Sequence, residues 1–253
     1  MKIFKDKLVN FASVMIFLAS LSSVNASADA VFTVDEGALL DTGATSLGGG
    51  LVQADKINGG YVETATFNLD GTFTSSGFAS FGQYYLGGFV VNPVQLTNTY
   101  GIVATFTTAG NFAPTLCGPF PCTIFSGVTA AIEIYLDPQL DSFTAVDGND
   151  VLLASTSSLI GLNGTLIPAF GGGFFDITFT NFLLTAAGEQ YFVQPDPFYI
   201  QTVVDGDFDS FTPAGTQTIR GDISAVFVPE PEILALMGMG LLGFGVSRRK
   251  KLA

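Results

Sequence analysis

Short runs of alternating apolar and polar residues, broken by Gly, Asn, Asp and Pro, fill the central part of the chain. Side chains of a β-strand point alternately to its two faces, so a period of two predicts half-buried strands. Residues 129–136 show the pattern most clearly, with Ile132, Ile134 and Leu136 on one face. Helical periodicity is not evident in this part. The pattern therefore predicts an all-β domain.

Turn residues separate the predicted strands. Asp70 and Gly71 lie between the predicted strands 61–67 and 72–81, and they predict a hairpin there. The alternating apolar residues change from odd to even positions between Phe179 and Phe182, which predicts a bulge near Asn181. Strands of this length, rich in Phe and β-branched residues, predict a single antiparallel β-sandwich or jelly-roll-like domain. The predicted strands are residues 61–67, 72–81, 100–107, 129–136, 151–155, 164–167, 174–185 and 222–228.

The start of the chain has the parts of a secretory signal peptide. Three lysines within the first seven residues precede an apolar run over residues 8–24. Ala26 and Ala28 then have the small-x-small spacing that a signal peptidase requires. We expect a signal helix over residues 1–28, removed after Ala28.

The end of the chain also points to a membrane. Residues 233–246 carry no charge, and a basic tail of Arg248, Arg249, Lys250 and Lys251 follows them. Cations near a membrane segment stay on the cytoplasmic side, so the preceding domain lies on the far side. As a helix the apolar run reaches about 21 Å, against roughly 30 Å of hydrocarbon core. A transient membrane stop that is later processed fits this length better than a permanent anchor.

A short motif precedes this apolar segment. Pro229, Glu230 and Pro231, followed by the C-terminal hydrophobic helix and the basic tail, resemble the PEP-CTERM sorting signal of Gram-negative bacteria that make exopolysaccharide. The resemblance implies cleavage at the motif by an integral-membrane exosortase, with only transient contact with the inner membrane. The chain then divides into a signal peptide (1–28), an acidic domain (29–228) and the sorting signal (229–253).

The charge of the central domain restricts its partners. Residues 29–228 contain 19 Asp and Glu against Lys56 and Arg220, a net charge of −17. Such a field repels nucleic acid and anionic lipid and attracts divalent cations. The same part holds 21 of the 25 phenylalanines, enough apolar surface to bury a core. We therefore expect a folded acidic domain that does not bind nucleic acid.

Histidine is absent from the chain, which removes Ser-His-Asp triads, Cys-His pairs and histidine zinc sites. A pair of carboxylates facing across a cleft could still hydrolyse glycosides, but no pair stands out among the 19 acids. We expect no catalytic residues and no enzymatic activity. Cys117 and Cys122 enclose a proline-stiffened loop, and in an exported protein this spacing predicts a local disulfide.

Three carboxylates at alternate positions, Asp205, Asp207 and Asp209, resemble the opening of a calcium-binding loop. Ser210 and Thr216 stand where an EF-hand has Gly and Glu, so an acidic loop without metal is the alternative. If a cofactor binds, calcium is expected.

Several phrases resemble the flocculation-associated PEP-CTERM proteins: residues 34–37, 54–61, 78–85 and 206–211, with the closing Val-Pro-Glu-Pro. The resemblance implies a protein at the cell surface or in the extracellular matrix that promotes bacterial aggregation with exopolysaccharide or cell-surface glycans. Two alternatives stay open. One is a carbohydrate-binding module, in which aromatic residues 78–89 would stack on sugars, although Phe is more often a core residue. The other is a carboxylate-dependent polysaccharide-modifying enzyme.

Overall fold

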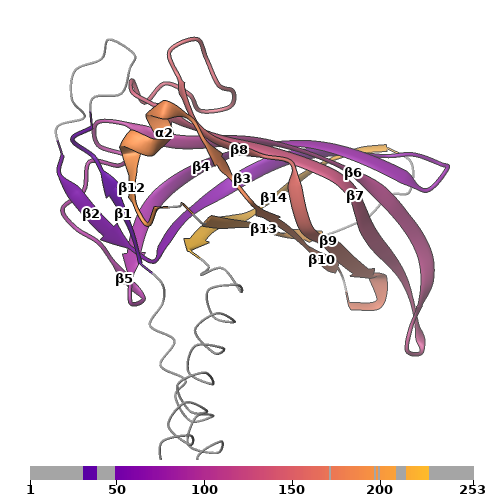
Figure 1. The fold of residues 1–253 in the computed structure, drawn as a ribbon. Coiled ribbons are helices and arrows are strands. Elements are labelled where there is room, and N and C mark those ends of the chain that lie inside the picture. The colour runs from indigo at the N-terminus through magenta and orange to yellow at the C-terminus, as the bar shows by residue number, and fades with distance from the viewer. Residues whose placement is uncertain are drawn as a thin grey trace, which may run out of the picture. The chain divides into compact units, whose positions relative to one another are not determined.

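A computed structural model describes residues 31–38, 49–170, 172–196, 198, 200–208 and 215–227 of the chain. Its main feature is a barrel of eight antiparallel strands (Figure 1). Neighbours around the barrel run β7, β6, β4, β3, β14, β13, β10 and β9, and β9 pairs with β7 again. The strands are β3 (Lys56–Phe67), β4 (Thr72–Leu86), β6 (Gly101–Cys117), β7 (Phe120–Asp137), β9 (Ser158–Ile167), β10 (Gly172–Thr180), β13 (Ile200–Phe208) and β14 (Gly215–Phe227).

The all-β antiparallel prediction is confirmed, but the expected sandwich of two sheets is replaced by one sheet that closes on itself. Closure depends on the length of β7, which spans 18 residues. Its C-terminal half pairs with β8 (Val151–Thr156), and residues 123–126 pair with β9. The chain bends at Ser157 between β8 and β9, so successive strands pair with different parts of β7. In a sandwich, β7 and β9 would be edge strands of the sheet and would not pair with each other.

The stagger of the strands fixes how wide the barrel is. A row of paired residues that starts at position 111 on β6 returns to the same strand at position 103, a displacement of eight residues. Eight strands with this stagger leave an interior just wide enough for side chains to fill. The full row is Asn111, Ser126, Asn163, Asp176, Asp205, Asp222, Gly60, Ser80 and Val103.

Phenylalanines fill most of this interior. The rings of Phe67, Phe73 and Phe125 pack within about 6 Å of one another, mostly edge to face. Gly77 of β4 makes room for the ring of Phe106, because a Cβ there would lie 2.1 Å from that ring. Close packing of aromatic rings thus explains both the Phe content and a glycine in mid-strand.

Each predicted strand corresponds to an observed one, but strand β13 was not predicted, because the sequence pattern assigns Asp205 and Asp207 to a loop. Two further differences occur. The segment expected at 174–185 is broken: β10 ends at Thr180, Asn181 has a positive φ of 53°, and β11 (Leu183–Leu184) follows. The six-residue helix α2 (Ala186–Tyr191) was not expected; Thr185 caps it by accepting the N–H of Gly188. The remaining elements are β1 (Phe32–Asp35), β2 (Leu51–Ala54), β5 (Phe89–Val90), β12 (Phe192–Gln194) and the 3-10 turn η1 (Pro168–Phe170).

Both ends of the described chain leave the barrel at the same end. β1 and β2 pair in a small sheet with β12, in which Phe32 lies opposite Ala54. Two residues later, Lys56 begins β3 opposite Val226 of β14. The first strand, β1, and the last strand, β14, therefore both lie next to the turn that joins β2 to β3 (Figure 1).

Candidate functional site

A carboxyl group, that of Glu63, lies inside the barrel. Glu63 belongs to β3, where Tyr61, Ala65 and Phe67 share its inward face. Only 3% of Glu63 is exposed to solvent. Burying a carboxyl group among apolar side chains is costly unless the group is hydrogen-bonded or protonated. Glu63 therefore differs sharply from the apolar residues that share its face of β3.

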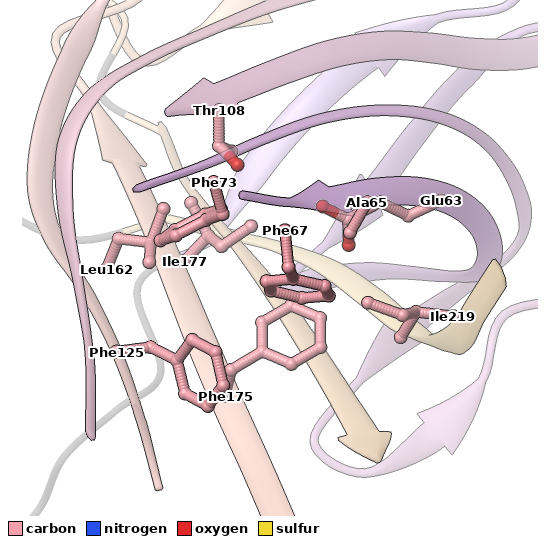
Figure 2. A pocket seen from close by; sticks show the side chains of 10 residues that line it. All are labelled: Glu63, Ala65, Phe67, Phe73, Thr108, Phe125, Leu162, Phe175, Ile177 and Ile219. Carbon is pink, nitrogen blue, oxygen red and sulfur yellow. The ribbon is translucent and has the colours of Figure 1, made fainter. Parts of the chain in front are cut away.

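The surroundings of Glu63 are mostly apolar. A hydrogen bond with the side chain of Ser75 holds the carboxyl group, while Oε2 has no hydrogen-bond partner. Figure 2 shows Glu63 and Thr108 on one side of a small cavity, with the rings of Phe125 and Phe175 on the other. The cavity is lined by Glu63, Ala65, Phe67, Phe73, Thr108, Phe125, Leu162, Phe175, Ile177 and Ile219.

The apolar surroundings change the acidity of Glu63. Burial raises its pKa from 4.5 to about 7, and the hydrogen bond with Ser75 lowers it by a smaller amount. The Oγ of Ser75 in turn lies 2.6 Å from Oγ1 of Thr108, so three polar groups form one chain inside the barrel. Near neutral pH the protonated and ionised forms of Glu63 are thus comparably populated.

The cavity beside Glu63 is small. Its volume open to the centre of a water molecule is about 20 Å³, enough for one water. Pockets for drug-sized ligands and cofactors measure roughly 300–1,000 Å³. The barrel interior is therefore a packed core that contains a titratable group, in agreement with its stagger.

A second buried polar cluster joins the small sheet to the barrel. Tyr100 donates its hydroxyl to Oε1 of Glu36 at 2.8 Å and lies 2.6 Å from the hydroxyl of Tyr191. The hydroxyl of Tyr84 bonds to those of Tyr100 and Tyr191. Burial raises the pKa of all three tyrosines, so their hydroxyls stay neutral. Glu36 also accepts the backbone N–H groups of Gln95 and Leu96.

This tyrosine–glutamate cluster is structural. Glu36 follows β1, Tyr84 lies on β4, Tyr100 precedes β6, and Tyr191 ends α2. Each of these four residues is at most 1% exposed. A saturated network without access to solvent fixes elements against each other and leaves no place for a substrate.

The predicted metal ligands lie partly in a regular strand. Asp205 and Asp207 belong to β13, whereas Asp209 lies outside the described residues. The backbone of Asp205 and Asp207 is thus an extended strand and not the curved loop that an EF-hand uses to gather its ligands. Within the described ranges no group of three acidic, cysteine or histidine side chains is placed to hold a metal ion. The calcium hypothesis stays a prediction.

Three carboxylates form a row on the outer face of the barrel. Asp205 lies directly opposite Asp176 of β10 on one side and Asp222 of β14 on the other. All three are exposed. Like charges directly opposite each other on neighbouring strands destabilise a sheet. The row therefore concentrates negative charge at some expense in stability.

A different acidic segment follows β7. Asp137 accepts the N–H groups of Gln139 and Ser142, and Asp150 accepts the hydroxyl of Ser142 and the N–H of Asp147. These carboxylates are turned toward their own loop. They stabilise its turns and do not face one another across a cleft, as a glycosidase pair would.

The predicted disulfide is present. Cys117 and Cys122 are joined, with 5.7 Å between their Cα atoms, across the turn of the long β6–β7 hairpin. Of the aromatic segment 78–89, Phe81 and Tyr84 are buried, while Tyr85 faces outward beneath the ammonium of Lys56. Tyr84 and Tyr85 therefore point to opposite faces of β4, and at most one of them could face a given sugar.

The terminal predictions lie outside the described residues. They concern the signal cleavage site at Ala26 and Ala28, the motif of Pro229, Glu230 and Pro231, and the basic tail. Among residues 31–227 that the structure describes, no helix is long and apolar enough to cross a membrane.

Comparison with known proteins settles the nature of the C-terminal segment. Residues 227–250 match the family model of the PEP-CTERM protein-sorting motif. The chain carries a PEP-CTERM motif. This motif implies an exported protein that an exosortase processes and that is sorted to the cell surface. No curated protein and no solved structure matches the chain.

Proposed function

We propose that this protein is a non-enzymatic surface or matrix protein that promotes bacterial cell aggregation in association with exopolysaccharide. Sorting to the surface places the barrel where cells meet. The interior is packed, so contacts with partners are made by the outer face. Many weak contacts between neighbouring copies and matrix would add up to strong adhesion without a deep site.

The observation that carries this proposal is the uneven distribution of charge over the outer face. The exposed row of Asp176, Asp205 and Asp222 lies on β10, β13 and β14. By contrast, no charged residue occurs between Asp70 and Glu133, a stretch that contains β4, β5, β6 and most of β7. One side of the barrel is thus acidic and the other neutral, and each can make a different kind of contact.

A groove beside α2 favours the second candidate, a carbohydrate-binding module. It lies among β11, α2 and β12 and has a volume of about 510 Å³. Phe192 and Phe198 pack with their ring centroids 4.5 Å apart along it, and the exposed carboxylates of Glu189 and Asp196 border it. Aromatic and carboxylate groups together are typical of sugar recognition. Saturable binding of one glycan to the monomer, abolished by Asp196→Asn, would favour this candidate over adhesion.

The aggregation proposal is tested in a strain that lacks the gene. Restoring the full chain should restore flocculation, and the double variant Asp176→Asn/Asp222→Asn should restore it less at equal surface amounts. Asp141→Asn, an exposed carboxylate outside both the acidic row and the groove beside α2, is the control. Normal flocculation in the deletion strain would overturn the proposal.

A further inference from the structure

The tip of the β4–β5 hairpin exposes a compact group of apolar side chains. Leu86, Phe89 and Val90 are 39%, 80% and 43% exposed. Gly87 and Gly88 form the two-residue turn, with φ angles of 59° and 82°. Positive φ at both central residues is the type I′ geometry of tight hairpins. The turn therefore holds Leu86 and Phe89 side by side on one face of the hairpin and Val90 on the other face, all three exposed to solvent.

The tip is held in place by the strand pairs beneath it. The carboxylate of Asp55 accepts the N–H of Gly87 at 2.5 Å, and the N–H of Asp55 donates to the carbonyl of Tyr85 at 2.8 Å. Val91 donates its N–H to the carbonyl of Tyr84 on the other side of the hairpin. Because the tip is already ordered, a contact made through Phe89 does not require the loss of conformational entropy in the hairpin.

The tip also lies close to the point where the chain leaves the barrel. Val226, Lys56, Tyr85 and Val90 form one row of paired residues across β14, β3, β4 and β5. Three strand spacings separate the ends of this row, about 14 Å. β14 ends at Phe227, and six residues later the apolar segment 233–246 begins, within about 20 Å along an extended chain.

We propose that the β4–β5 tip is a membrane-contacting surface that rests on the lipid bilayer beside the sorting segment while the precursor is still anchored. This inference rests on the sorting motif and not on the proposed role in aggregation. The short connection to residue 233 keeps this end of the barrel near the bilayer, where exposed apolar side chains gain by leaving water. Leu86, Phe89 and Val90 carry no charge, and the Asp55 carboxylate beneath them is buried with Lys56 next to it in the chain, so anionic lipid is not repelled locally at the tip. The acidic row lies on other strands.

Contact at the tip would also serve the processing step. Pro229 follows the last strand by two positions, so the orientation of the barrel decides where the cleavage motif lies. A second contact beside the anchor restricts rotation of the barrel about its single connection. The motif is then held at the membrane surface, at the level where an integral-membrane protease acts.

The chain contains no tryptophan, which gives a direct test. Phe89→Trp places a single indole at the tip. Leu69→Trp is the matched control, because Leu69 is 91% exposed on the β3–β4 turn at the opposite end of the barrel. Each full-length variant is reconstituted into vesicles of phosphatidylethanolamine and phosphatidylglycerol that contain brominated phospholipid. Equal melting temperatures show that both variants fold as the parent does.

We expect a blue-shifted emission and at least twofold quenching for Phe89→Trp, with neither change for Leu69→Trp. If the chain floats with the vesicles but the two probes behave alike, the tip does not touch lipid and the proposal is overturned while sorting stands. If the chain does not float with vesicles, the membrane role of the C-terminal segment fails as well. Quenching that appears only with exosortase present would assign the tip to the enzyme and overturn lipid contact.

Discussion

The hydroxyl of Tyr100 donates to Oε1 of Glu36 at 2.8 Å, in a place that solvent does not reach. This bond connects the small sheet to the start of β6, and Tyr84 and Tyr191 extend it to β4 and α2. The elements that close one end of the barrel are therefore joined by polar contacts as well as by apolar packing.

Removing one hydroxyl tests the strength of this connection. Tyr100→Phe removes one buried hydrogen-bond partner from each of Glu36, Tyr84 and Tyr191, and such losses cost about 1–3 kcal/mol. Urea denaturation should show a lower midpoint with an unchanged slope. Tyr85→Phe is the control, because its hydroxyl bonds to Gln83 at the surface and its loss should change stability by less than about 0.5 kcal/mol. Equal effects of the two changes would contradict the buried network.

Glu63 predicts an unusual dependence of stability on pH. Its pKa is about 7 in the folded barrel and 4.5 in the unfolded chain, so the folded state binds the proton more tightly. The stability that this proton confers is complete below pH 4.5 and is lost as the pH rises through 7, on the order of 3 kcal/mol in total. Glu63→Gln cannot ionise. Its free energy of unfolding should therefore rise relative to the parent between pH 5 and 8.

The measurement is a series of urea titrations across that pH range for the parent, Glu63→Gln and Glu189→Gln. The last change removes an exposed carboxylate from α2 and should run parallel to the parent. A constant difference between Glu63→Gln and the parent would show that Glu63 does not titrate inside the barrel.

The disulfide should stabilise one part of the fold selectively. Beyond Asn111, β6 pairs with β7 alone, so residues 113–117 have a neighbour on one side only. Replacing Cys117 and Cys122 by Ser should cost about 2 kcal/mol at most, since the closed loop is short. Hydrogen exchange should accelerate at residues 113–122 and stay unchanged in β3 and β14. Uniform acceleration throughout the barrel would contradict a local role.

The carboxylate row predicts a stabilising substitution. Asp222→Asn removes the repulsion between Asp222 and Asp205, worth roughly 0.2–1 kcal/mol. The gain in melting temperature should be largest at low ionic strength and fade toward 1 M salt, because exposed charges are screened. Asp196→Asn, whose carboxylate is exposed away from the row, should show no comparable gain. A gain that does not depend on salt would point to another cause.

Local pattern was sufficient to predict seven of the eight barrel strands, but neither β13 nor the closure of the barrel. Alternation identified residues 61–67 of β3 and 222–228 of β14, yet nothing local states that β3 and β14 pair across most of the chain. The closing contact of residues 123–126 with β9 also depends on how far β7 extends beyond the predicted 129–136. Register between distant strands is a property of the whole sheet. The sequence therefore predicts an antiparallel β fold, whereas the closure of the sheet into a barrel is known only from the structure.

Glu63 could have been found from the sequence. It shares the parity of Tyr61, Ala65 and Phe67, so a strand with those residues inside must carry its carboxyl group inward. The helix α2 gave a weaker signal, because six residues contain less than two turns and only Thr185 marks its start. The partners of Tyr100 lie 64 and 91 positions away and have no local signature.

The place of β14 in the barrel sets an order of events during secretion. β14 lies between β3 and β13, and it is the last strand before the sorting motif. Until its residues have been translocated, the sheet keeps an open seam along both of those neighbours. The final strand and the cleavage motif arrive almost together, so the exosortase meets its substrate at the moment when the barrel can first be completed.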